Sequence, residues 1–329
     1  MKVKVRSFSK INLGLRIGQR RGDGFHDLLT VYQTIALHDF LQVEVKRGFG
    51  IEIRSGDPRV PTDASNTCYR IAELVVAALK ASGRVVIEIE KHLPVQGGLG
   101  GASGNAVTAM LALERALGKQ LPGPDKLRIA AEVGSDLPLF LVGGLVLGTG
   151  RGEQVYPLCD TPSMPCVVAI PEISVSTPKA FGDWDGIAAA RKLTLSRGSD
   201  RMLEFGREVS AWLSGLPGQN PGRPLSGVPA SGRGRAESPL LDLVQTGIEN
   251  DFEQVVFPKY PELREIKCLL QQSGAAYASL SGSGSAVYGL FRSPSAAKKA
   301  QAKLLKNGVG AQLTSTLTRR QYWTRLFDC

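Results

Sequence analysis

The sequence predicts a two-domain α+β protein, on three observations. The chain has 329 residues, more than a single hydrophobic core usually organises. Its first third alternates apolar and polar residues as β-strands do, and helical patterns follow. Its last third has a strand, helix, strand order that is typical of a βαβ-like unit. We expect residues 1–160 to form the first domain and residues 161–329 the second.

The first domain is expected to begin with strands. Five segments, KVKVRSF, INLGLRI, LLTVYQTI, LQVEV and GIEIRS, are rich in β-branched residues or alternate in period two. Asn66 is a candidate cap for a helix that extends to Lys80, and a strand follows at Val85–Glu90. A further helix is expected to begin near Ser103. Four of its residues are spaced to form one buried stripe: Ala106, Met110, Leu113 and Leu117.

Later segments complete both domains. Residues 127–142 are expected to be helical in two pieces, followed by a hairpin in GLVLGTGRGEQVYPL. The second domain is expected to begin with a buried strand at residues 166–170 and a helix over residues 192–213. A Gly/Pro-rich insert at residues 216–239 has little apolar content and is expected to be mobile. A helix ending at Gly274 precedes a strand–glycine–strand unit, AYASLSGSGSAVYGLF, then a helix and the strand AQLTSTLT.

Composition excludes several classes of protein. No run of eighteen apolar residues is present, so no transmembrane helix is expected, and the first residues alternate rather than form the apolar core of an export signal. The five cysteines lack CxxC spacing and are expected to be reduced in a cytoplasmic protein. We expect no metal cage, because the three histidines have no ligand spacing: His26, His38 and His92.

The net charge of +10 raises the question of nucleic-acid binding. Residues 292–329 contain eight basic residues and one acidic residue, and residues 191–235 contain eight basic and three acidic residues. Neither stretch interleaves aromatic with basic residues as a base-stacking surface does. We therefore expect no nucleic-acid partner and interpret the charge as a field that attracts anionic substrates.

The segment LPVQGGLGGASGNAVTAMLALERAL places many glycines directly before a helix. Glycine allows a ligand to approach the backbone closely, and the first turn of a helix offers unpaired N–H groups and partial positive charge. The segment therefore predicts a phosphate cradle, with a flexible connection as the alternative. It is neither a Walker loop, since no Gly-Lys-Ser/Thr follows, nor a dinucleotide fingerprint, since Ser103 replaces the third glycine.

Three further features favour a catalytic site. They are Lys10 on an alternating strand, Asp136 in GSDLPLF, and the late glycine loop in SLSGSGSAVYGLF. Taken singly, the lysine is typical of a solvated strand face, the aspartate of a helix cap, and the loop of a hairpin turn. Their occurrence together and in this order favours a phosphoryl-transfer site.

With these motifs, the sequence resembles the GHMP kinases (galacto-, homoserine, mevalonate and phosphomevalonate kinases). SKINLGLRIGQRRGDGFHDLLTVYQTIAL, VGSDLPLFL, STPKAF and NDFE most resemble the branch that phosphorylates the 2-hydroxyl of 4-diphosphocytidyl-2-C-methyl-D-erythritol in the non-mevalonate isoprenoid pathway. The resemblance covers nearly the whole chain except the insert. It implies a ribosomal-S5-like N-terminal domain, a ferredoxin-like C-terminal domain, an active site in the cleft between them, and the use of ATP with Mg²⁺.

The resemblance also implies the role of each site residue. Lys10 and Asp136 match the catalytic pair, in which the carboxylate accepts a proton from the acceptor hydroxyl and the ammonium offsets developing charge. Asn66 matches a position near the nucleoside. The residues that match the ATP loop are Pro94, Val95, Gln96, Gly97, Gly98, Leu99, Gly100, Gly101, Ala102, Ser103 and Gly104.

On the acceptor side, Phe25 and His26 match an aromatic–histidine pair that holds the cytosine, and Phe181 matches an aromatic residue on its opposite face. Asn12 and Thr177 match polar positions of the same pocket. Aromatic planes suit this role because every base presents a π-face.

The sequence departs from the family pattern at three positions. Ala102 replaces a glycine and tolerates positive φ less well, and Gly104 lacks the hydroxyl of the usual serine. Phe25 replaces a tyrosine and keeps the stacking surface without the phenolic donor. These departures affect the expected catalytic efficiency and phosphate geometry more than the assignment to the family.

Two alternatives stay open. One is another GHMP small-molecule kinase, such as a mevalonate or sugar kinase, although the segment from Lys10 to His26 argues for the cytidine substrate. The other is a non-catalytic nucleotide-binding or RNA-associated module, which the basic C-terminal region and the altered glycine loop would suit. We expect a monomer or a weak homodimer.

Overall fold

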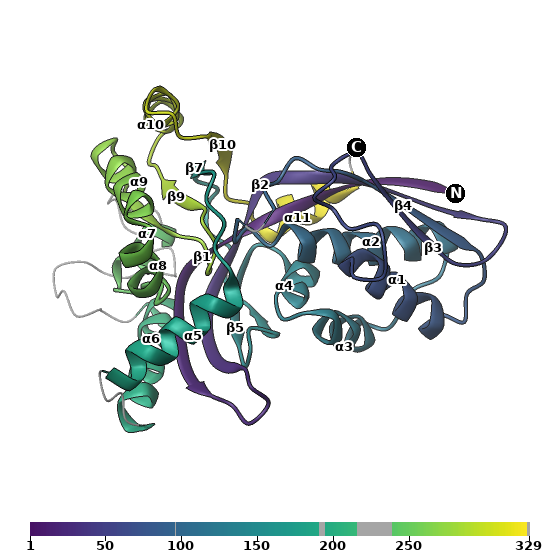
Figure 1. Ribbon diagram of the computed structural model, residues 1–329, viewed down its shortest axis with the longest axis horizontal. Coiled ribbons are helices and arrows are strands. Elements are labelled where there is room, and N and C mark those ends of the chain that lie inside the picture. The colour runs from purple at the N-terminus through teal and green to yellow at the C-terminus, as the bar shows by residue number, and fades with distance from the viewer. Residues whose placement is uncertain (96, 191–194, 216–238, 328–329) are drawn as a thin grey trace.

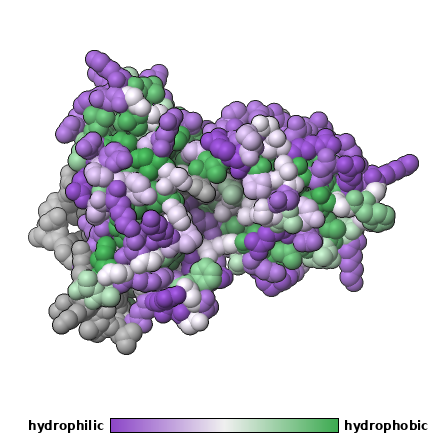
Figure 2. Space-filling model, viewed as in Figure 1, coloured by the Kyte–Doolittle hydropathy of each residue, from purple (hydrophilic) through white to green (hydrophobic). Residues whose placement is uncertain are grey.

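The computed structural model describes residues 1–95, 97–190, 195–215 and 239–327. It has two lobes, each built on a β-sheet, and β1 and β2 extend from one lobe into the other (Figure 1). Polar side chains cover much of the visible face, which is hollowed between the lobes (Figure 2). In the described part of the chain, no helix has both the length and the apolarity needed to cross a membrane.

The N-terminal sheet has the order β3-β4-β2-β5-β6, with β1 paired to β2. Its neighbouring strands are antiparallel except for β3 and β4, which are parallel. Every first-domain segment expected to be a strand lies in a strand of this sheet, and the hairpin of β5 and β6 is present. The strands are β1 (Lys2–Arg20), β2 (His26–Lys46), β3 (Ile51–Ser55), β4 (Arg84–Glu90), β5 (Leu145–Thr149) and β6 (Gln154–Pro157).

β1 and β2 are each continuous, so the prediction of two shorter strands in each region is wrong. Irregularities in the β1–β2 register at Phe8/Ser9 and Asn12/Gly14 let the long ribbon bend without a break. The middle of β1 is buried on both faces because it lies between two cores, with Phe8 in one cluster and Ile11 in the other. Polar residues in this stretch are therefore held in fixed positions.

Helices cover one face of the N-terminal sheet (Figure 1). Asn66 caps α1 as predicted, since its side chain accepts a hydrogen bond from the Cys68 backbone N–H. The two predicted pieces of residues 127–142 are α3 and α4. These helices are α1 (Thr67–Ala78), α2 (Gly101–Leu117), α3 (Gly123–Val133), α4 (Leu137–Val142) and α11 (Arg319–Leu326).

α2 lies at the centre of the N-terminal lobe. It begins at Gly101, two residues before the expected start, and every residue from Gly104 to Glu114 is buried. The single buried stripe that the sequence predicts is therefore incomplete, because α2 is packed against α1, α4, β1 and β2 on several sides. This close packing fixes the helix whose N-terminus receives the glycine segment.

The C-terminal sheet has the order β10-β7-β9-β8 and is antiparallel throughout. Because β9 and β10 flank β7, the segment from β9 through α10 to β10 is the crossover that the βαβ-like pattern predicts. The strands are β7 (Pro165–Ala169), β8 (Tyr277–Leu280), β9 (Val287–Leu290) and β10 (Ala311–Ser315). The helices are α5 (Thr177–Ala190), α6 (Leu195–Ser214), α7 (Pro239–Gln245), α8 (Glu253–Lys259), α9 (Pro261–Gln272) and α10 (Pro294–Lys306).

Four helices were not expected from the sequence: α5, α7, α8 and α11. α5 begins at Thr177, in a segment treated only as a motif, and α11 lies in the basic C-terminal region. α11 has a capping box between Thr318 and Gln321, a local signal that identifies its start. The predicted insert at residues 216–239 lies outside the described residues except for Pro239, the first residue of α7.

A substitution at Gly104 tests the packing of α2 against β1. A Cβ at this position would lie 2.7 Å from the Phe8 carbonyl oxygen, so we expect Gly104→Ala to lower the free energy of unfolding by about 1–3 kcal/mol. Denaturant unfolding measures this difference. Gly123→Ala is the matched control, since a Cβ at the first residue of α3 meets no atom within 4 Å. Equal stability of the two variants would contradict the packing.

Candidate active site

The structure brings Lys10 and Asp136 together. The Lys10 Nζ lies 3.3 Å from Asp136 Oδ2, although the two residues come from the middle of β1 and the turn before α4. Lys10 is only 3% exposed, which excludes a solvated strand face. The Asp136 side chain makes no capping hydrogen bond to α4, which excludes a simple helix cap. Both polar groups instead line one cavity between the lobes.

Two neighbours fix this pair. The Lys10 Nζ donates a hydrogen bond of 2.6 Å to Asn12 Oδ1, and the Tyr32 hydroxyl donates one of 3.1 Å to Asp136 Oδ1. Burial first, and the negative charge of Asp136 second, raise the pKa of Tyr32 well above its usual value, so its hydroxyl keeps its proton. Tyr32 was missed in the sequence because it lies within an apolar strand pattern. Its register partner on β1 is Asn12, which is the signal that places it at the site.

The two glycine loops pack backbone against backbone. The Ala286 N–H donates to the Gly97 carbonyl at 3.1 Å, and the Ser281 hydroxyl donates to the Gly98 carbonyl at 2.9 Å. Gly98 has a φ of 77°, and a Cβ there would lie 2.1 Å from the Ser281 carbonyl oxygen. The close contact between the two loops therefore requires glycine in the first loop, whether or not a ligand also approaches its backbone.

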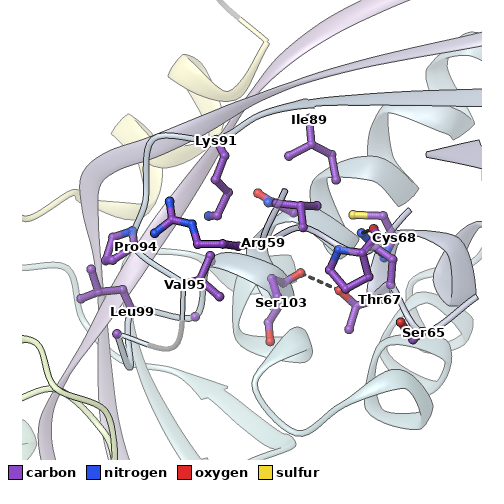
Figure 3. Close-up of a pocket in the computed structure, with 18 of the residues that line it drawn as sticks. Arg59, Ser65, Thr67, Cys68, Ile89, Lys91, Pro94, Val95, Leu99 and Ser103 are labelled. Atoms are coloured by element: carbon purple, nitrogen blue, oxygen red, sulfur yellow. Dashed lines mark hydrogen bonds between the residues drawn. The ribbon is translucent and has the colours of Figure 1, made fainter. Parts of the chain in front are cut away.

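The first glycine loop also lines a second cavity, which we call the glycine-loop cavity (Figure 3). Gly100 precedes α2 in the left-handed conformation, and no side chain caps this helix end, so the N–H groups of its first turn are left for a ligand. The lining residues anticipated from the sequence are Asn66, Pro94, Val95, Gly97, Gly98, Leu99, Gly100, Gly101, Ala102 and Ser103. Gln96 lies outside the described residues.

The structure accounts for two departures from the family pattern. Ala102 is an exposed residue in the first turn of α2 and does not have a positive φ, so its methyl group causes no backbone strain. Gly104 lines neither cavity and packs against β1, where a larger residue would be crowded. Neither residue distorts the loop.

The cavity between the lobes, which we call the interlobe cavity, continues from Asp136 to α5. Thr177, Phe181 and Asp185 are spaced four residues apart, lie on one side of α5, and all line this cavity. Thr177 Oγ1 is hydrogen-bonded to the Ser283 hydroxyl at 2.7 Å, which ties α5 to the late glycine loop. Asp185, the third member of the series, was not anticipated from the sequence.

His26 is buried against α5. Its Nε2 lies 2.7 Å from Asp185 Oδ1, and its ring stacks on Phe181 with centroids 5.1 Å apart and planes 13° apart. A base held between two rings needs them roughly 7 Å apart, twice the contact distance. The structure therefore does not place Phe181 and His26 on opposite faces of a base.

Phe25 lies apart from that stack, at the exposed rim of the interlobe cavity. It is 50% exposed, and the Arg151 guanidinium lies 4.8 Å from its ring centroid. Phe25 lacks the phenolic hydroxyl of tyrosine, and this cation–π contact holds its ring in place without that group. Of the anticipated acceptor-side residues, all five line this cavity: Asn12, Phe25, His26, Thr177 and Phe181.

Comparison with known families identifies the class. The family model described as GHMP kinases N terminal domain matches residues 66–144, and the one described as GHMP kinases C terminal matches residues 237–310. The fold and the two glycine loops define the chain as a GHMP kinase, an ATP-dependent small-molecule kinase. Mevalonate kinase from L. major, in complex with R-mevalonate, has the same fold, with a TM-score of 0.69 at 16% identity over 96% of each chain.

Relatives identify the family within this class. The chain is 36% identical to 4-diphosphocytidyl-2-C-methyl-D-erythritol kinase of Solibacter usitatus, over 88% of this chain and 81% of the relative. It is 34% identical to the enzyme of that name from Synechococcus sp., over 90% and 86%. A crystal structure of 4-(cytidine 5'-diphospho)-2C-methyl-D-erythritol kinase matches with a TM-score of 0.68 at 28% identity, over 95% of this chain and 98% of that one. The chain belongs to the 4-diphosphocytidyl-2-C-methyl-D-erythritol kinase family.

Tyr32→Phe removes only the hydroxyl that donates to Asp136. We expect kcat to fall by about 3- to 10-fold, since one hydrogen bond to a charged group is lost, while the fold is retained. Steady-state kinetics measures the change. Tyr322→Phe is the matched control, because that buried hydroxyl donates to the Phe140 carbonyl outside the site. If both variants keep the wild-type kcat, Tyr32 does not act on Asp136.

Proposed function

We propose that this protein transfers the γ-phosphoryl group of ATP to the 2-hydroxyl of 4-diphosphocytidyl-2-C-methyl-D-erythritol, in the non-mevalonate isoprenoid pathway. One observation carries the proposal beyond the family relationship. The ion pair of Lys10 and Asp136 lines the same cavity as the glycine loop at one end and the aromatic residues of α5 and β2 at the other. A nucleotide and a cytidine-linked acceptor bound at the two ends would meet at this pair.

The acceptor hydroxyl is activated by Asp136 in this proposal. The carboxylate accepts the hydroxyl proton as the phosphoryl group is transferred, while Tyr32 holds one of its oxygens and Lys10 lies beside the other. The Lys10 ammonium offsets negative charge on the transferring group. Asn12 holds that ammonium in place.

The glycine-loop cavity binds ATP. Backbone N–H groups at the start of α2 bind the phosphates, and the partial positive charge of the helix N-terminus favours them. Apolar residues that line the cavity, among them Val60, Ile89 and Val95, offer a surface for the purine. Asn66 lines the same cavity beside the cap of α1.

Mg²⁺ accompanies ATP in this proposal. Across the described residues, no three His, Cys, Asp or Glu side chains cluster in a way that could hold a metal ion. Ser103 and Asp136 do line the same cavity, and this sparse oxygen set fits an ion that is held mainly by phosphates and water. Bound there, Mg²⁺ would neutralise phosphate charge; the chain would contribute the Ser103 hydroxyl beside it.

The cytosine binds at the outer end of the interlobe cavity. We infer that it stacks against Phe25 or Phe181 and that His26 contacts its edge, since His26 and Phe181 already share a stack. Asp185 holds His26 Nε2, so the ring presents a fixed orientation to a ligand.

We also propose the division into residues 1–160 and 161–329, a cytoplasmic location, and a monomer or weak homodimer.

The acceptor is tested by measuring ADP release. We expect turnover with 4-diphosphocytidyl-2-C-methyl-D-erythritol and none with mevalonate, galactose or homoserine. Asp136→Asn should lower kcat by about two to four orders of magnitude, as loss of a positioned base implies. Asp125→Asn, on the exposed side of α3, is the control and should keep the wild-type rate.

Other outcomes of this assay favour the alternatives. Turnover of mevalonate or a sugar would assign the chain to another activity of the class. Tight binding of ATP without turnover of any acceptor would identify a non-catalytic nucleotide-binding module.

Asp185→Asn tests the acceptor end of the cavity. We expect the KM for the cytidine substrate to rise by about 3- to 10-fold, because His26 loses a charged partner, while the KM for ATP stays constant. Asp183→Asn is the matched control on the same helix, since Asp183 pairs with Lys259 at the surface. A rise of the same size in both variants would indicate a general effect on α5.

A further inference from the structure

Asp39 is a buried carboxylate that the proposed chemistry does not use. It lies on β2, has no exposed surface, and accepts hydrogen bonds from four donors. The donors are the Lys91 Nζ at 2.6 Å, the His92 N–H at 2.7 Å, the Leu93 N–H at 2.7 Å and the Asn105 Nδ2 at 3.0 Å. Together they join β2 to the segment after β4 and to α2.

Two of these donors line the glycine-loop cavity. Figure 3 shows the Lys91 side chain extending into it beside Arg59. The Lys91 ammonium also lies at the start of α2, because a Cβ at Gly101 would be 3.1 Å from its Nζ. Asn105 lines the cavity from α2. The backbone donors, His92 and Leu93, come directly before the glycine loop, so Asp39 contacts its entry as well as its exit.

Asp39 also sets the orientation of the Asn105 amide. The carboxylate can only accept, so the amide must turn its NH₂ group toward it. The amide oxygen is then left over, and within the described part of the chain this buried atom has no hydrogen-bond partner. A buried polar atom without a partner is costly, so this oxygen is suited to accept from a donor on a bound nucleotide.

The Lys91 ammonium depends on the same carboxylate. Its side chain is 7% exposed, and a buried cation is stable only beside an opposite charge. Asp39 supplies that charge through one contact and leaves the other N–H donors of Lys91 for a ligand. Without it, the ammonium would reorient toward solvent or lose its position at the start of α2.

We propose that Asp39 is a positioning residue for ATP. It holds the Lys91 ammonium, the Asn105 amide and the entry of the glycine loop in one arrangement that binds the nucleotide. This inference rests on the proposed function. It assigns no chemical step to Asp39, which acts only through its four donors.

Asp39→Asn tests the assignment, because the variant keeps the shape of the side chain and loses its charge. We expect the KM for ATP to rise by roughly 10- to 100-fold, as loss of charged hydrogen bonds implies. The kcat and the KM for the cytidine substrate should stay within about threefold of wild type. A KM does not depend on the active fraction of a preparation, so partial misfolding would not produce this result.

Asp251→Asn is the matched control. Asp251 is also fully buried and accepts from the Arg16 Nη1 at 3.0 Å and the Ile17 N–H at 2.9 Å, away from the glycine-loop cavity. We expect a loss of thermal stability in this variant without a change in the KM for ATP. A KM for ATP that is raised equally in both variants, or in neither, would overturn the proposal.

Asn105→Leu decides the question if Asp39→Asn does not fold. It removes one donor and the unpartnered oxygen while leaving the carboxylate and Lys91 in place, and we expect the KM for ATP to rise by about 3- to 10-fold. An unchanged KM would overturn the proposal. Failure of the proposed function is a separate result, since the wild-type protein would then not turn over the cytidine substrate at all.

Discussion

The ion pair of Lys10 and Asp136 is the constraint on which the site depends. An ammonium at a position that is 3% exposed needs an opposite charge, and Asp136 supplies it from a turn that is distant in the sequence. The fold provides the burial because the middle of β1 lies between the cores of both lobes. The turn before α4 must then face β1, and the Tyr32 hydroxyl completes the arrangement from β2.

The two glycine loops lie beside this pair, and the first of them lines both the glycine-loop cavity and the interlobe cavity. Their backbones touch at Gly98 and Ser281, so the C-terminal lobe helps to hold the first glycine loop in this position. The Lys10 N–H also donates to the Leu99 carbonyl at 3.0 Å, which fixes the loop over Lys10. The glycines therefore serve the junction of the lobes as well as the proposed phosphate cradle.

Patterns that act over a few residues could be predicted from the sequence, and tertiary contacts could not. The α1 cap at Asn66, the two glycine loops and most elements were predicted because turn chemistry and periodicity are local. The continuity of β1, the burial of α2 on several sides, and the roles of Tyr32, Asp185 and Asp39 depend on register and on packing between distant segments. Asp39 illustrates this limit, since its four donors come from residues 91 to 105 and nothing near it in the sequence marks it.

The most direct test of the central claim is the ³¹P NMR spectrum of a reaction containing ATP, Mg²⁺ and 4-diphosphocytidyl-2-C-methyl-D-erythritol. If Lys10 and Asp136 direct the phosphoryl group to the acceptor alcohol, one new phosphomonoester signal appears while the diphosphate signals of the acceptor are retained. Conversion of ATP to ADP and inorganic phosphate, without a new monoester, would contradict the account, because water rather than the bound alcohol would then be the acceptor.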